Sequence, residues 1–104
     1  AKAEDNFRRA IKLDPTFCPA YLNLGAMYAD MGRHEAAIIE LQKIIEFCPS
    51  TMIEGRARLL LGVELNQLGR HREACEQFAI VLKEFPNTTL AAKAAEYLRL
   101  SQCH

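Results

Sequence analysis

Histidine and cysteine side chains are the residues of this chain whose types and spacing could support metal or redox chemistry. His71 and Cys75 are four residues apart, so on a helix they would share one face and could both ligate a metal ion. A structural zinc site needs four ligands, and no CxxC or HxxxH pair supplies the others. His34 and His71 each follow a Gly-Arg pair, and recurrence at a turn favours a role at the start of a helix. We therefore expect no metal site and no catalytic histidine.

The four cysteines raise the question of disulfide bonding. Cys18 and Cys48 would lie at the same open end of a helical hairpin, because their numbers are nearly symmetric about the intervening turn. The axes of packed helices lie about 8 to 10 Å apart, whereas Cα atoms joined by a disulfide lie about 4.4 to 6.8 Å apart. The sequence therefore favours two free, half-buried thiols, although a bond between Cys18 and Cys48 stays conceivable. An intact mass without the loss of two hydrogens would exclude the bond and favour a reducing compartment. Cys103, near the C-terminal end, adds little information.

Length and composition predict one packed, soluble domain. The 104 residues are half apolar and one-quarter charged, and the thirteen Lys and Arg residues balance the thirteen Asp and Glu residues. No net charge therefore attracts nucleic acid, and apolar runs such as 59–63 are far shorter than the roughly 20 residues that cross a bilayer. No nucleophile–base arrangement or phosphate-binding glycine loop is visible, so we expect no enzyme activity and no cofactor.

The N-terminal residue bears on the compartment. Ala1, rather than Met, opens a charged amphipathic run, and we expect a fragment of a longer protein. The compartment is then unknown, with the cytoplasm favoured and the periplasm or another compartment as alternatives.

An internal repeat organises the sequence. Positions that match 37 residues apart are Leu24 and Leu61, Gly25 and Gly62, Gly32-Arg33-His34 and Gly69-Arg70-His71, Ala37 and Ala74, Leu41 and Phe78, Ile44 and Val81, and Pro49 and Pro86. At an offset of 34 residues, Ala37, Leu41, Ile44 and Pro49 match Ala3, Phe7, Ala10 and Pro15. The unit is therefore about 34 residues long and is lengthened once by three.

Each unit contains two helices. Tyr21, Leu24 and Tyr28 form one apolar stripe at helical spacing. Gly32 and Gly69 are placed to end the first helix of each unit, and the second helices end at Pro15, Pro49 and Pro86. A capping box from Thr51 to Glu54 predicts that the three added residues extend the start of the next helix. The expected helices cover residues 1–13, 17–31, 34–47, 51–68, 71–84 and 89–102.

Small residues predict where the helices approach closely. Gly25 and Gly62 lie in mid-helix, where glycine costs about 1 kcal/mol relative to alanine. We expect the facing small side chains to be Ala37 and Ala74. The large residues Tyr28, Leu41, Leu65 and Phe78 would fill the space beside these contacts.

The pattern resembles the tetratricopeptide repeat. The likeness lies in Tyr21, Leu24, Gly25, Tyr28, Gly32, Ala37, Leu41, Ile44 and Pro49, and it recurs in tandem. It implies an all-α, right-handed superhelix of antiparallel helix pairs, an α-solenoid of about six helices. One domain, 1–104, would contain a second helix (1–16), a repeat (17–50), a lengthened repeat (51–87) and a terminal capping helix (88–104). Two departures are Arg58, at a position usually aromatic, and Arg99, at the position of Gly25 and Gly62.

The resemblance implies a scaffold that binds a peptide or protein segment on its concave face. That groove would be lined by Leu22, Asn23, Ala26, Ala29, Leu59, Leu60, Val63, Asn66, Tyr97 and Leu100, with Arg56 and Lys93 beside them. Some members clamp a carboxylate with Lys, Asn and Arg. Asn23 matches the central amide, but Leu60 and Tyr97 stand where a second cation would be, so we expect no complete clamp.

Three alternatives stay open. A neighbouring helix could cover Leu59, Leu60 and Val63. The module could assemble with copies of itself, because an array that begins at Ala1 would bare the inward face of its opening helix, including Phe7, Ala10 and Ile11. It could also be the regulatory arm of a larger enzyme.

Overall fold

The computed structural model describes residues 2–101 and 103, and these residues form six helices. The helices are α1 (Lys2–Leu13), α2 (Cys18–Asp30), α3 (His34–Phe47), α4 (Met52–Gln67), α5 (His71–Glu84) and α6 (Thr89–Leu100). The predicted all-α class is confirmed, and the described ranges contain no strand. The last helix ends at Leu100, before the predicted end at residue 102. Residues 1 and 102, which the predicted bounds included, lie outside the described ranges.

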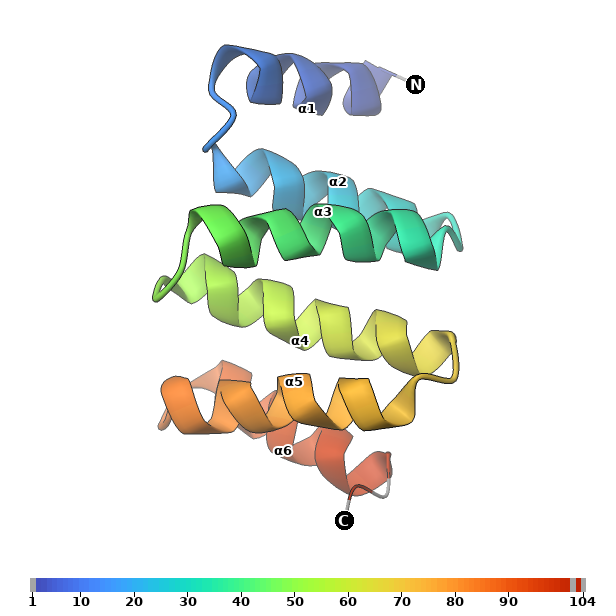
Figure 1. Ribbon diagram of the computed structural model, residues 1–104, viewed down its shortest axis with the longest axis vertical. Helices are drawn as coiled ribbons and strands as arrows, with labels where there is room; N and C mark the ends of the chain where they lie inside the picture. Colours follow the sequence, from blue (N-terminus) through green and yellow to red (C-terminus); the bar gives the residue numbers. More distant parts are fainter. Residues whose placement is uncertain (1, 102, 104) are drawn as a thin grey trace.

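The helices stack as antiparallel pairs along the long axis of the molecule (Figure 1). Each helix packs against the next, and in addition α2 contacts α4 and α4 contacts α6. The second helices of successive units, α3 and α5, make no comparable contact within the described part of the chain. First helices are therefore closer together than second helices, so the stack curves with α2, α4 and α6 on its inner side.

The turns between helices use left-handed residues at equivalent places. Gly32 and Gly69 have φ of +76° and +77°, which confirms that they end the first helices in the conformation only glycine adopts without cost. In the turns that follow α3 and α5, Ser50 and Asn87 have φ of 64° and 63°. The two turns therefore share a left-handed conformation, which Asn87 tolerates better than Ser50 because asparagine adopts it more readily.

Helix α4 is 16 residues long and α2 is 13, and the additional residues are at the start of α4, as predicted. The Thr51 hydroxyl accepts a hydrogen bond from the Glu54 amide at 3.2 Å. The Glu54 carboxylate accepts one from the Ser50 amide at 2.6 Å, which completes the capping arrangement one residue earlier than the usual box. Thr88 caps α6 in the same way, accepting from the Ala91 amide at 3.1 Å.

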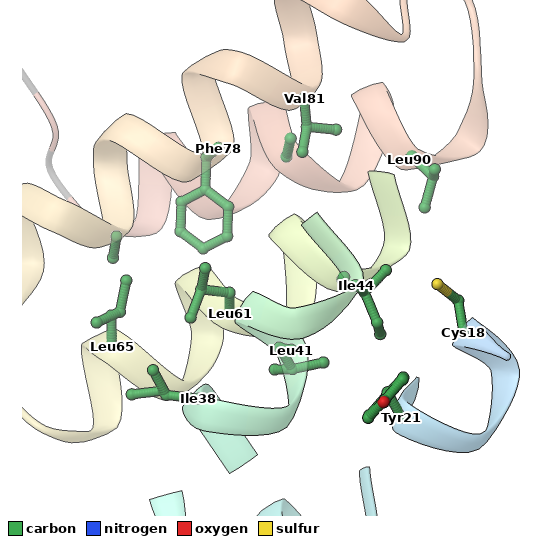
Figure 2. Packing of buried hydrophobic residues seen from close by; sticks show 13 residues of the cluster. Cys18, Tyr21, Ile38, Leu41, Ile44, Leu61, Leu65, Phe78, Val81 and Leu90 are labelled. Atoms are coloured by element: carbon green, nitrogen blue, oxygen red, sulfur yellow. The ribbon is translucent and has the colours of Figure 1, made fainter. Parts of the chain in front are cut away.

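The core lies between the helix pairs, where Leu41, Ile44, Phe78 and Val81 are fully buried (Figure 2). A Cβ atom at Gly25 would lie 2.9 Å from Leu41 Cδ2, and one at Gly62 would lie 2.5 Å from Phe78 Cε1. Ala37 does lie beside Gly25, with its carbonyl oxygen 3.6 Å from that Cβ position, but the nearest atoms at both glycines belong to the large residue one turn further along the second helix, which the alanine prediction did not include.

Both pairs of cysteines are bonded, so the expectation of free thiols is wrong. Cys18 is joined to Cys48 with Cα atoms 6.6 Å apart, and Cys75 is joined to Cys103 with Cα atoms 5.9 Å apart. The argument from axis separation fails because Cys48 and Cys103 lie just past helix ends, where the backbone leaves the helix axis and can approach its neighbour. Disulfides persist in oxidising compartments, so the expectation of a reducing one loses its basis.

Candidate functional site

An open hollow of about 380 Å³ lies between α4 and α6 on the inner side of the stack. Six of the twelve residues predicted in or beside the groove line it, namely Arg56, Leu59, Leu60, Val63, Lys93 and Tyr97. They meet because they occupy equivalent faces of two first helices that contact each other directly. Leu59, Leu60 and Val63 are half-buried: they pack against the main core and still line the hollow.

The hollow has an apolar floor and a cationic rim. Arg56 on α4 and Lys93 on α6 occupy equivalent repeat positions, and both are exposed. Tyr97 is held in place by stacking on Phe78, with ring centroids 5.2 Å apart and planes 16° apart. Such a surface can take up an apolar side chain on a rigid floor while a carboxylate contacts the cations at its edge.

The remaining predicted groove residues do not line this hollow. On α2, Leu22 and Ala26 are half-buried and Asn23 is exposed, one repeat away from it. Asn66 lies further along α4, at a separate hollow of about 410 Å³ that is also lined by His71, Leu100 and Ser101. The sequence therefore predicted the inner face, but not where along it the surface is hollowed.

The amide of Asn66 is occupied by the chain itself. Its Nδ2 donates to Ser101 Oγ at 2.8 Å, and its Oδ1 accepts from His71 Nδ1 at 2.8 Å. Both polar ends of this predicted groove residue are therefore bonded within the molecule. Ala29 is half-buried, and the Leu100 side chain beside this hollow is exposed.

Sequence reasoning missed Thr89 and Leu90, which also line the hollow between α4 and α6. Leu90 packs against Gly55, where a Cβ would lie 2.9 Å from Leu90 Cδ1. The available signal was the glycine: Gly55 lies in the first turns of a long helix, and a glycine that weakens a helix often marks a close neighbour.

Arg58, the departure from the family pattern, compensates a buried carboxylate. Its Nε donates to Glu54 Oε2 at 2.6 Å, and its Nη1 donates to Gln77 Oε1 on α5 at 2.8 Å. Burial opposes ionisation of Glu54, but the hydrogen bonds from Arg58 and the Ser50 amide outweigh it and hold the pKa of Glu54 below its ordinary value of 4.5. The guanidinium thus joins the two helices of the lengthened repeat in place of an aromatic contact.

The two repeated histidines begin α3 and α5, as their recurrence predicted. Their rings contact neighbouring helices and do not cap their own. His34 Nδ1 pairs with Glu64 Oε2 on α4, a carboxylate that is only 4% exposed. His71 forms a hydrogen bond with Asn66. Cys75, which shares a helix face with His71 and was the other possible metal ligand, forms a disulfide with Cys103.

The opening helix α1 is docked against α2. The Tyr28 hydroxyl donates to Glu4 Oε2 at 2.9 Å, and Arg8 Nε donates to the same oxygen at 3.0 Å. The Tyr28 hydrogen bond, supported by Arg8, lowers the pKa of Glu4. Phe7 and Ile11 pack beside Tyr28 and are half-buried, so the expectation that they are bare is wrong.

Ala10, the third residue of α1 that was expected to be bare, is also half-buried.

None of the helices in the described ranges is long and apolar enough to cross a membrane.

Comparisons with known proteins agree with this architecture. Residues 6–39 match one family model and residues 56–88 match a second, and both models describe the tetratricopeptide repeat. A 48-residue stretch, 46% of this chain, is 42% identical to a UDP-N-acetylglucosamine–peptide N-acetylglucosaminyltransferase of Giardia intestinalis. That stretch spans 3% of the length of the transferase. From its two family matches and its stacked helix pairs, the chain belongs to the tetratricopeptide repeat family, whose members are protein–protein interaction modules.

Proposed function

We propose that this module binds an extended peptide segment in the hollow between α4 and α6, with an apolar side chain on the floor and an acidic group at the rim. The observation that carries the proposal is the hollow itself, whose lining combines half-buried Leu60 and Val63 with exposed Arg56 and Lys93. Partly exposed apolar surface next to unpaired charge is typical of a docking site, because a partner can bury the first and neutralise the second.

The rigidity of the floor supports the same function. Tyr97 is stacked on the fully buried Phe78, and Leu90 is fixed against Gly55. A peptide that enters would therefore meet side chains that lose little conformational freedom on binding, which favours affinity. The inner position of the hollow also lets one extended segment run along successive first helices.

Selection of binders from a random peptide library against the wild-type protein tests this proposal. Peptides that bind should carry an aliphatic or aromatic residue near an Asp, a Glu or a free C-terminus. Their affinity, measured by fluorescence anisotropy, should fall by at least tenfold for Leu60→Asp/Val63→Asp and by about three- to tenfold for Arg56→Glu/Lys93→Glu. The salt dependence of binding should also change sign in the charge-reversed pair, because salt screens an attraction to the acidic group in the wild type and a repulsion in the variant.

Ile39→Asp on α3 is the matched control. Ile39 is an exposed aliphatic residue on a second helix, outside the hollow, and its replacement should leave the affinity unchanged. Far-ultraviolet circular dichroism should show the same helix content for all variants. Selected peptides that bind the Leu60→Asp/Val63→Asp variant as tightly as the wild type would place the binding site elsewhere.

A second candidate function is the regulatory arm of a larger enzyme. It is favoured by the similarity to the Giardia transferase, whose name describes transfer of N-acetylglucosamine to a peptide. In such a protein the hollow would present a peptide segment to a catalytic unit elsewhere in the parent chain. Deletion of this module from the parent enzyme should then raise KM for a peptide substrate that carries the selected motif, and should leave KM for the sugar donor unchanged. Restoring the module should restore the KM for the peptide.

A further inference from the structure

The two disulfides differ in the solvent exposure of their cysteines. Cys75 and Cys103 both line a hollow of about 660 Å³ between α5 and the end of α6. In the other bond, Cys48 is half-buried like Cys75 and Cys103, but Cys18 is only 1% exposed and is part of the main core cluster. A thiolate must reach a sulfur atom in line with the bond to reduce it, and the Cys75–Cys103 bond offers two half-buried cysteines beside an open hollow where the other bond offers one, so it is the more accessible of the two.

The Cys75–Cys103 bond holds the chain where it covers Asn66. Ser101, two residues before Cys103, accepts the hydrogen bond from Asn66 Nδ2. Ser101 and His71 line both the 660 Å³ hollow and the 410 Å³ hollow at Asn66. Ser101 therefore borders both hollows, as His71 does.

We propose that the Cys75–Cys103 bond is a redox-sensitive latch, and that its reduction by a dithiol releases Ser101 and uncovers the Asn66 amide. One thiolate of the reductant attacks a sulfur of the bond and displaces the other cysteine as a thiolate. The second thiol of the reductant then resolves the mixed disulfide, so the protein gains two thiols and the reductant leaves as a disulfide. The two hollows then join, and Asn66 becomes an accessible donor on the inner face.

Two features make the released state accessible. Helix α6 ends at Leu100, whose side chain is 67% exposed and therefore contributes little packing at this end of the helix. Two backbone bonds of the kind that closes a helix end hold this segment: the Ser101 amide donates to the Tyr97 carbonyl at 2.8 Å, and the Cys103 amide donates to the Leu98 carbonyl at 3.2 Å. Without the disulfide, chain entropy opposes the closed position, and only these terminal bonds and the Asn66–Ser101 bond offset it.

Graded reduction of the intact protein tests the latch. Samples treated with increasing dithiothreitol are alkylated and mapped by mass spectrometry, and Cys75 and Cys103 should be labelled before Cys18 and Cys48. In parallel, the side-chain amide resonances of Asn66 in ¹⁵N NMR spectra should shift and exchange with water about fivefold faster once the first bond is reduced.

Paired variants separate the latch from a general loosening of the fold. Cys75→Ser/Cys103→Ser should show the reduced-state Asn66 signals without reductant and no further change when it is added. Cys18→Ala/Cys48→Ala, the matched control, should keep the Asn66 signals of the oxidised protein until reductant is added. Reduction of Cys18–Cys48 first, or unchanged Asn66 signals in both the reduced wild type and the serine variant, would overturn the proposal. The readout concerns Asn66 alone, so it does not depend on peptide binding between α4 and α6.

Discussion

The repeat formed by α2 and α3 and the repeat formed by α4 and α5 have the same backbone plan but are fastened differently. Helix α2 begins without a side-chain cap, and a disulfide from Cys18 to Cys48 closes its open end. Helix α4 begins with a Thr51 cap, and an ion pair between Glu54 and Arg58 lies behind it. The three added residues of α4 include Glu54, and the capping residue Thr51 directly precedes them. Equivalent positions in a repeat therefore specify the architecture without specifying the interactions that secure it.

The inner contacts of the two repeats differ in the same way. Leu41 presses on Gly25 in the first repeat, and the larger Phe78 presses on Gly62 in the second. His34 reaches a buried carboxylate on the next helix, whereas the equivalent His71 bonds an amide that is itself bonded to Ser101. Each difference predicts that matched substitutions have unequal effects.

The largest expected effect is that of Arg58→Met, which leaves Glu54 buried without its cation. The free energy of unfolding at pH 7, from urea titration, should fall by about 3 kcal/mol, because an uncompensated buried charge is strongly unfavourable. Since the folded-state pKa of Glu54 lies below 4.5, the wild type has this stabilisation in full above pH 4.5 and loses it as the pH falls through the folded pKa.

The variant should therefore approach the wild type in stability as the pH falls below 4.5, where Glu54 becomes protonated in the unfolded chain and in the variant. Arg56→Met, on the exposed side of the same helix, is the control and should change stability by less than about 0.5 kcal/mol. A gap between Arg58→Met and the wild type that stays constant down to acid pH would contradict the role given to Glu54.

The glycine contacts give the next largest difference. Gly62→Ala should lower the free energy of unfolding by about 2 kcal/mol, because its Cβ would lie 2.5 Å from the buried ring of Phe78, which is stacked on Tyr97. Gly25→Ala should cost less than about 1 kcal/mol, since the end of Leu41 can rotate away and alanine favours the helix. Phe78→Leu should rescue Gly62→Ala, and equal losses for the two glycines would contradict the comparison.

The substitutions of the two histidines have the next largest expected difference in stability. His34→Ala should lower the free energy of unfolding by about 1.5 kcal/mol, because it leaves the buried Glu64 carboxylate without this partner. His71→Ala should cost less than about 0.5 kcal/mol, because the ring is exposed and Asn66 keeps its bond to Ser101. Thermal unfolding followed by circular dichroism would rank the two variants, and a larger loss for His71→Ala would reverse the assignment.

The smallest expected effect is stabilising. Ser50→Gly should raise the free energy of unfolding by about 1 kcal/mol, because Ser50 is held at a φ of 64° that costs a residue with a Cβ atom. Asn87→Gly, at the equivalent turn, should gain less, since asparagine tolerates this conformation. Urea titration of both variants checks this, and a loss of stability in Ser50→Gly would show that the serine side chain has another role.

Much of the candidate site was predictable from sequence. Arg56 and Lys93, Leu60 and Tyr97 occupy equivalent repeat positions, and a repeat brings equivalent positions to one face. The sequence did not predict that Asn66 is bonded to Ser101, because that contact depends on where the chain turns after α6. It also did not predict that Leu41 and Phe78 make the nearest contacts at the two glycines, since those contacts depend on the rotation of one helix against another.

The sequence by itself determined the helices, their ends and their stacking, because glycine, proline, capping residues and apolar periodicity act locally and recur at a fixed interval. Only the tertiary structure decided the disulfide pairs, the buried ion pair at Glu54 and the position of the hollow between α4 and α6. These features depend on distances of a few ångströms between helix ends and faces, and a one-dimensional pattern contains no record of such distances.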